Sequence, residues 1–162
     1  MVDSVIANIP INNTKKGVTA LDVPAQVFNK KLAEFFKEKS LIKLPGYSTL
    51  VKCARSNELN PIDPDWFFHK AAAIARQVYI TKSKTLGVGS LKCLLGKKYR
   101  RGRLPSVTSK ASGKIIRDII TQLKKNGYVE NYASTEGVTL GLLLTKSGKS
   151  ALDKIAATIL RK

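Results

Sequence analysis

The sequence has few of the side chains that build metal sites. It contains one histidine and two cysteines among 162 residues. A zinc site needs about four such ligands in suitable spacing, and the three present are scattered. Cys53 and Cys93 stand forty positions apart without a paired motif, which favours two reduced thiols in a cytosolic or nuclear protein. We expect no metal and no cofactor.

Signals for membranes and secretion are also missing. No apolar run reaches the ~18 residues that a membrane-spanning helix needs. The first residues lack the basic region and the hydrophobic stretch of a signal peptide. We therefore expect neither a transmembrane segment nor secretion.

Catalytic groups are sparse. His69 is the one histidine, and its place in a helical pattern is more typical of a core or RNA-contacting side chain than of a base. Asp63 and Asp65 stand at the start of that helix, where they face the positive end of the helix dipole. Gly87-Val88-Gly89 is a weak nucleotide motif, because Lys92 stands where a third glycine belongs. We expect no enzyme and no small-molecule substrate.

Negative charge is absent from the middle of the chain. Lys and Arg number 29 against 11 Asp and Glu, which gives a net charge of +18. No carboxylate occurs between Asp65 and Asp118, whereas thirteen Lys or Arg do. Such a surplus repels itself in the compact state, so a polyanionic partner is its natural explanation. Nucleic acid is the first candidate and an anionic membrane surface the second.

This acid-free stretch supplies the candidate binding residues. Residues 81–105 hold eight basic side chains, and their glycines predict an irregular basic loop. Lysine and arginine neutralise phosphates, and arginine can also fork across two oxygens or stack on an unpaired base. A solvated face is the alternative, and Tyr99 could stack on a base or anchor the loop. The candidate RNA-binding residues are Lys70, Arg76, Lys82, Lys84, Lys92, Lys97, Lys98, Arg100, Arg101, Arg103, Lys110, Lys114 and Arg117.

Residues 63–80 predict the helix around which the chain is organised. Asp63 is a good N-cap and Pro64 suits the first helical position. The stretch is apolar over most of its circumference, which is typical of a buried helix. Its polar residues, among them Lys70 and Arg76, fall in one narrow stripe. This stripe is the first sign of a basic face on the central helix.

Other helices are predicted on both sides of this one. One begins near Pro24, a shorter one covers Tyr47 to Ala54 and buries Leu50 and Val51, a third is capped by Ser109, and the last is capped by Thr145. Asn126-Gly127 ends the third helix with C-cap chemistry.

Strands are predicted between the last two helices, where residues 128–132 and 138–144 form a β-hairpin. The fold class is therefore mainly α, a helical bundle around a central helix with a small β-hairpin, winged-helix-like. We expect residues 1–16 to be a flexible arm and residues 17–162 to form a single winged-helix-like domain that binds nucleic acid.

A winged helix also permits a DNA-binding regulator with one helix in the major groove. The basic residues on and beside the helix of residues 115–123 keep that alternative open, and they are Lys110, Lys114, Arg117, Lys124 and Lys125. Against it, most of the charge lies in the glycine-rich stretch. Basic loops with an extra arm are more typical of proteins that brace folded RNA.

Several motifs in combination are family-specific. From Gly17 to about Ala157 the chain resembles small-subunit ribosomal protein nineteen of the eukaryotic and archaeal type. The matching motifs are Gly17-Val18-Thr19, Asp22-Val23, Trp66-Phe67-Phe68, Ala71-Ala72, Ala75-Arg76, Gly87-Val88-Gly89-Ser90, Pro105-Ser106, Leu144-Thr145-Lys146-Ser147-Gly148 and Leu152-Asp153-Lys154-Ile155-Ala156.

The resemblance implies a constituent of the 40S subunit head that contacts small-subunit rRNA and neighbouring ribosomal proteins. It also implies a role in rRNA maturation, with assembly in the nucleus or nucleolus and residence in the cytoplasm. Lys70 and Arg76 fall on the family's basic central-helix positions, where Lys70 replaces the more usual arginine. Residues 1–16 have no clear counterpart, and Leu140 to Leu144 are more apolar than the family norm, which could mark a protein neighbour.

Overall fold

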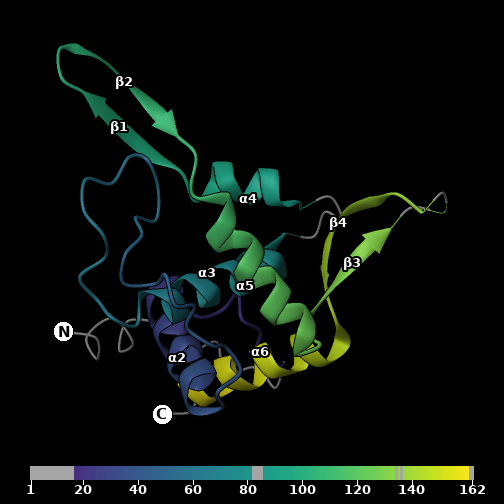
Figure 1. Cartoon of the computed structure of the whole chain (residues 1–162). Coiled ribbons are helices and arrows are strands. Elements are labelled where there is room, and N and C mark those ends of the chain that lie inside the picture. The colour runs from purple at the N-terminus through teal and green to yellow at the C-terminus, as the bar shows by residue number, and fades with distance from the viewer. Residues whose placement is uncertain (1–16, 82–85, 134, 136, 161–162) are drawn as a thin grey trace.

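The computed structural model describes residues 17–81, 86–133, 135 and 137–160. This part of the chain forms five helices and two separate two-stranded antiparallel sheets, which confirms the mainly α, winged-helix-like fold (Figure 1). The predicted arm of residues 1–16, together with Lys82 and Lys84, lies outside the described residues. The elements are α2 (Ala25–Glu38), α3 (Trp66–Ile80), α4 (Val88–Leu94), β1 (Lys97–Arg101), β2 (Leu104–Ser109), α5 (Gly113–Lys125), β3 (Val129–Ala133), β4 (Thr139–Leu144) and α6 (Lys146–Leu160).

Helix α3 lies at the centre, as predicted, and contacts α2, α5 and β4. It begins at Trp66 rather than at Pro64, because the preceding residues form a turn in which Asp63 Oδ1 accepts the Asp65 amide at 2.9 Å. The indole of Trp66 packs edge-on against the ring of Phe67, and its Nε1 donates to Ser48 O at 3.2 Å. The buried residues of α3 are Trp66, Phe67, Phe68, Ala71, Ala72, Ile74, Ala75 and Val78.

The first and last helices close one side of this core. Helix α2 packs on both α3 and α6. The Asp153 carboxylate of α6 accepts the Tyr79 hydroxyl at 2.7 Å and the Ala20 amide at 3.2 Å. Burial, together with this hydrogen bond, raises the pKa of Tyr79 to about 12. Asp153 therefore joins the C-terminal helix to the central helix and to the segment before α2.

Helix α5 and the following hairpin carry the capping signals that the sequence contains. Asn126 is the C-cap of α5, and Gly127 at φ +70° allows the Tyr128 amide to bond Leu123 O, a Schellman ending. Thr145 caps α6 as predicted, since its Oγ1 accepts the Gly148 amide at 3.0 Å. The start of α5 differs from the prediction: its N-cap is Ser112, because Ser109 ends strand β2.

The predicted hairpin of residues 128–144 is confirmed as β3 and β4. The strands pair antiparallel, with Val129 opposite Leu144 and Asn131 opposite Leu142. Val129, Leu142 and Leu144 are buried in the core, so the wing is fixed at its base while strands β3 and β4 lead away from the body (Figure 1). No helix in the described part of the chain is both long and apolar enough to cross a membrane.

The predicted helix over residues 47–54 is wrong. This segment consists of successive turns, and Leu50 is 82% exposed rather than buried. Its conformation is set by distant partners: Tyr47 donates its hydroxyl to Asp118 of α5, and Ala54 bridges to Ala111. Such tertiary contacts override the local periodicity that suggested a helix.

We expect Trp66→Ala to lower the free energy of unfolding by about 3–5 kcal/mol, because the side chain is 9% exposed and its removal leaves a cavity in the core. Leu50→Ala serves as the control, and its effect should stay within about 0.5 kcal/mol. Urea denaturation of both variants is the measurement. Equal losses would mean that Trp66 does not help to hold the core.

A pair of glycine variants tests how closely α6 packs against the base of the wing. A Cβ at Gly148 would lie 2.5 Å from Tyr128 O, whereas a Cβ at Gly89 in α4 meets nothing within 4 Å. Gly148→Ala should therefore cost about 1–3 kcal/mol through overpacking, and Gly89→Ala should stabilise by about 0.5–1 kcal/mol through its helix propensity. Thermal melts that move in the same direction for both variants would contradict this packing.

Candidate nucleic-acid interface

The basic stretch of residues 97–109 is a β-hairpin with one register shift between Tyr99 and Arg101, so the predicted irregular loop is wrong. Lys97 pairs with Ser109, Lys98 with Thr108 and Arg101 with Leu104. Gly102, at φ +66°, is the first residue of the two-residue turn, as a type II′ hairpin requires. Neither strand buries a residue. The stretch therefore lacks the alternating apolar pattern by which strands are recognised.

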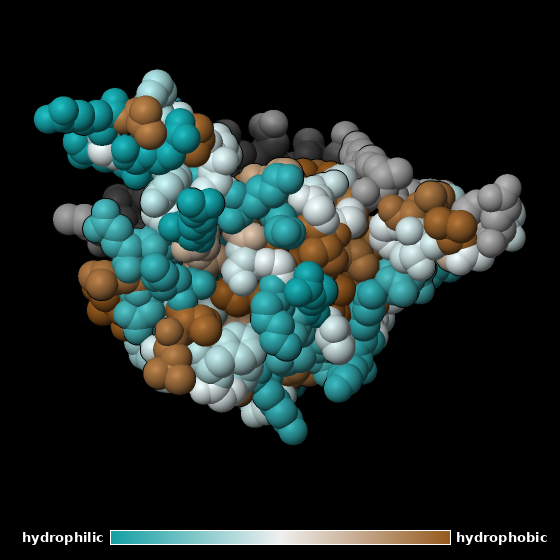
Figure 2. Space-filling view, turned by 45° about the horizontal axis from the view of Figure 1, so that its top comes forward, coloured by the Kyte–Doolittle hydropathy of each residue, from teal (hydrophilic) through white to brown (hydrophobic). Residues whose placement is uncertain are grey.

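This hairpin projects from the helical body, on the side away from the wing (Figure 1). Figure 2 shows that its visible surface is largely hydrophilic, with a few apolar side chains. None of its cations pairs with a carboxylate in the described part of the chain. The exposed cations of the hairpin are Lys97, Lys98, Arg100, Arg101 and Arg103. The ribbon thus presents uncompensated positive charge to solvent.

Two side chains hold the hairpin in place. Arg101 folds back along it, donating from Nε and Nη2 to Pro105 O at 3.2 and 2.9 Å. The ring of Tyr99 lies 5.6 Å from the guanidinium carbon of Arg55, in the segment before α3. Tyr99 therefore anchors the hairpin to that segment, which favours the anchoring alternative over base stacking. Arg100 and Arg103 make no comparable contact in the described structure, so their guanidinium groups are available to bind phosphate.

Lys92 and Arg117 meet at the start of α5. A Cβ on Gly113 would lie 3.1 Å from Arg117 Nη1 and 3.4 Å from Lys92 Cδ, so both side chains pass over this glycine. The Ala111 amide donates to Lys92 O at 3.0 Å and fixes α4 beside α5. The structure thereby gathers Lys92 from α4 with the predicted basic residues of α5.

Lys70 lines a cleft of about 560 Å³ between α3, the base of the hairpin and the segment before α3. Burial lowers the pKa of Lys70, and the nearby charge of Lys97 lowers it further, against an opposing effect of Cys53. Burial likewise raises the pKa of the Cys53 thiol, although Lys70 and Lys97 oppose that shift. Lys70 thus lies beside Lys97 at the base of the hairpin.

Arg76 and Lys70 lie on different sides of α3, although the sequence predicted that they share one narrow stripe. Six residues separate them, which puts them about 120° apart around the helix. Arg76 is half-buried, and its Nε has no hydrogen-bond partner in the described structure. The predicted stripe is therefore broad, with Lys70 on the edge that faces the hairpin.

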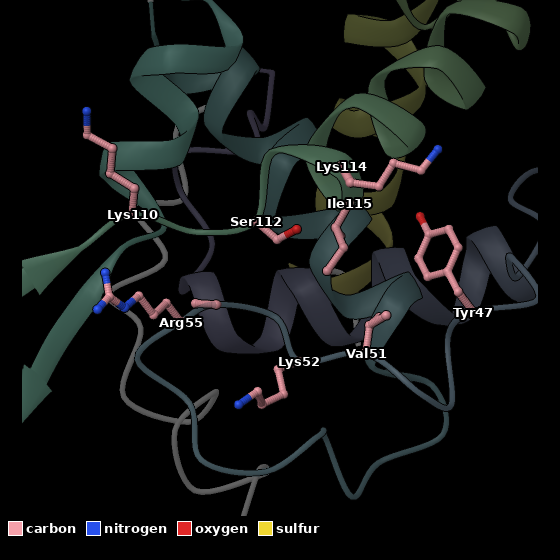
Figure 3. Close-up of a pocket in the computed structure, with 9 residues that line it drawn as sticks. Tyr47, Val51, Lys52, Arg55, Lys110, Ser112, Lys114 and Ile115 are labelled. Carbon is pink, nitrogen blue, oxygen red and sulfur yellow. The ribbon is translucent and has the colours of Figure 1, made fainter.

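Two basic residues of the interface were missed by the sequence analysis. Lys52 and Arg55 line a cavity of about 510 Å³ together with Lys110 and Lys114 (Figure 3). They precede the acid-free stretch of residues 66–117, from which all the predicted binding residues come. A second acid-free interval, from Lys39 to Asn57, was the signal that could have revealed them.

Carboxylates compensate the charge elsewhere. Lys31 pairs with Glu34 at 2.7 Å, and Lys37 with Asp65 at 2.7 Å. His69 Nε2 lies 3.5 Å from Asp63 Oδ2 at the exposed start of α3. Over the residues that the structure describes, no three His, Cys, Asp or Glu side chains gather as metal ligands would. Apart from Lys31, Lys37 and Lys114, which pairs with Asp118 at 3.3 Å, the described lysines and arginines pair with no described carboxylate, and the β1–β2 hairpin carries five of these cations on one projecting element.

Comparison with known proteins agrees with this picture. The sequence model of the ribosomal protein S19e family matches residues 19–162. Small ribosomal subunit protein eS19 of Argopecten irradians is 36% identical over 146 residues, which cover 90% of this chain and 96% of the relative. The protein of the same name from Emericella nidulans is 39% identical over 142 residues, covering 88% and 92%. Protein eS19A of Saccharomyces cerevisiae is 37% identical over 147 residues, covering 90% and 97%.

The fold and this surface define a winged-helix-like protein with a projecting basic hairpin. With the family match over nearly the whole chain, they lead to a plain assignment: the chain belongs to the ribosomal protein S19e family. The resemblance inferred from the motifs is thereby confirmed.

Lys70→Met should stabilise the isolated protein at pH 7. The folded-state pKa of Lys70 is lowered, so its protonated form opposes folding below that pKa, and the penalty fades as the pH rises toward the unfolded value of 10.5. The gain from Lys70→Met should therefore shrink between pH 7 and pH 10 in urea denaturation. Lys98→Met, on the exposed strand, is the control and should change stability by less than about 0.5 kcal/mol. A Lys70→Met protein that is less stable at pH 7 would contradict a desolvated ammonium.

Proposed function

We propose that this protein is a non-catalytic constituent of the small ribosomal subunit that binds and braces rRNA in the subunit head. The family and the names of its relatives support the ribosomal part of this proposal. The uncompensated charge of the β1–β2 hairpin is the observation that carries the RNA-binding part.

The mechanism is electrostatic. Each cation that meets a phosphate releases condensed counterions, which drives binding and makes it sensitive to salt. Arg101 and Tyr99 fix the backbone that carries the free cations, so little ordering of the loop is required on binding. Lys92, Lys110 and Arg117 extend the charge along the start of α5, where the charge of Lys114 is partly offset by Asp118. Such an arrangement suits two RNA segments that approach each other, since it neutralises phosphates on both.

The other predicted features complete the proposal. Residues 17–162 act as one rRNA-binding domain, and residues 1–16 as an arm that contacts the assembled particle. Val138 and Leu140 on the wing are 57% and 45% exposed, which suits contact with a neighbouring ribosomal protein. The protein supports maturation of small-subunit rRNA, enters the particle in the nucleus or nucleolus and works in the cytoplasm.

One observation favours the alternative of a DNA-binding regulator. Helix α5 precedes the wing, as a recognition helix does, and exposes Lys114, Arg117 and Lys125. The hairpin, however, carries more free charge than this helix face. A regulator would discriminate between DNA sequences, whereas bracing of rRNA would not require it.

Gradient sedimentation of cell extract tests the proposal. At moderate salt the wild-type protein should travel with small-subunit fractions. A variant with Lys98, Arg100 and Arg103 changed to Ala should shift to the top of the gradient, because three exposed phosphate contacts are lost. The matched control replaces three exposed lysines of α6, Lys146, Lys149 and Lys154, and should still sediment with the subunit. Absence of the wild-type protein from small-subunit fractions would refute the proposal.

A further inference from the structure

The cavity beside α5 is built from two kinds of side chain. Val51 and Ala54 of the segment before α3 face Ile115 of α5, with Tyr47 at one end. The remaining lining residues are Lys52, Arg55, Lys110, Ser112 and Lys114. Its volume of about 510 Å³ falls in the range of sites that hold small organic groups. Phosphate contacts alone would not need the apolar part of this lining.

Charge is distributed unevenly around this cavity. Lys52, Arg55 and Lys110 form no ion pair with any described carboxylate. Lys114 Nζ lies 3.3 Å from Asp118 Oδ1 and 5.9 Å from the centre of the Tyr47 ring. Asp118 lies outside the lining, and its other oxygen accepts the Tyr47 hydroxyl. The cavity therefore has a positive rim and an interior that is largely apolar.

The cavity is continuous with the hairpin surface. Arg55 on its rim packs over Tyr99 of β1. Lys110, also on the rim, directly follows the last residue of β2. Figure 3 shows both residues on the side of the cavity from which the two strands depart. A strand of RNA held by the hairpin would therefore pass the mouth of this cavity.

We propose that the cavity receives one unpaired nucleotide of the RNA that the β1–β2 hairpin holds. The base enters between Val51 and Ile115, beside Tyr47, and its flanking phosphates meet the cations of the rim. Unstacked bases of RNA loops and bulges are held in this way, by aromatic or apolar contact together with basic side chains. A paired base cannot enter, because pairing and stacking keep it within the helix. This inference rests on the proposed rRNA-binding function.

A pair of short RNA duplexes provides the test. One contains a single-nucleotide bulge of 2-aminopurine, and the other is the fully paired duplex of the same length. The full-length wild-type protein should bind the bulged duplex about tenfold more tightly, which is the gain expected from one held base. The emission of 2-aminopurine should change on binding. Equal affinity for the two duplexes would overturn the cavity proposal and leave rRNA binding intact, whereas binding to neither would count against the proposed function itself.

Two variants separate the cavity from the hairpin. Val51→Trp fills the cavity and should reduce the preference for the bulged duplex to about one, with affinity for the paired duplex within about twofold of wild type. The double variant Lys52→Ala, Lys110→Ala changes only exposed side chains of the rim, leaves the Arg55–Tyr99 contact in place and should also reduce the preference.

The double variant Lys146→Ala, Lys149→Ala on α6 removes the same charge elsewhere and should keep the preference. A thermal melt verifies that each variant is folded. A preference that survives in both cavity variants would overturn the proposal.

Discussion

Burial of α3 on almost every side is the constraint on which the remaining structure depends. A helix with eight buried residues needs apolar partners all around it, and α2, α5 and β4 supply them. These partners use their own apolar faces for this purpose, so their charged residues turn outward. Asp153 and the Tyr47–Asp118 hydrogen bond then fix the peripheral segments to the same core. The outward positions of the basic groups on the helices follow from this packing arrangement.

The β1–β2 hairpin takes no part in this core. Strands β1 and β2 bury no residue, so their stability comes from pairing, from the Gly102 turn and from the anchors Arg101 and Tyr99. The core therefore places no demand on the composition of the hairpin, which can carry many cations at little cost to folding. Carboxylates such as Glu34 and Asp65 offset part of the charge away from it. Charge segregation of this kind is expected of a protein that binds a polyanion on one side.

The sequence predicted the parts of the fold whose signals are local. Apolar periodicity identified α3, and the capping residues Asn126, Gly127 and Thr145 marked the ends of α5 and α6. It failed where tertiary contacts decide: residues 47–54 are held by α5 and α3 rather than by their own periodicity. The β1–β2 hairpin was not predicted, because exposed strands show no alternation of apolar and polar residues. Gly102 between Arg101 and Arg103 was nevertheless a usable turn signal. Lys52 and Arg55 join the basic surface only through folding, since α5 lies far from them in sequence.

The central claim is that the β1–β2 hairpin is the face that meets rRNA. A structure of the small ribosomal subunit containing this chain tests it most directly. The account predicts phosphate oxygens of rRNA within hydrogen-bonding distance of Arg100 and Arg103, with α6 turned away from the RNA. A subunit in which the hairpin points into solvent while α6 contacts the rRNA would contradict it.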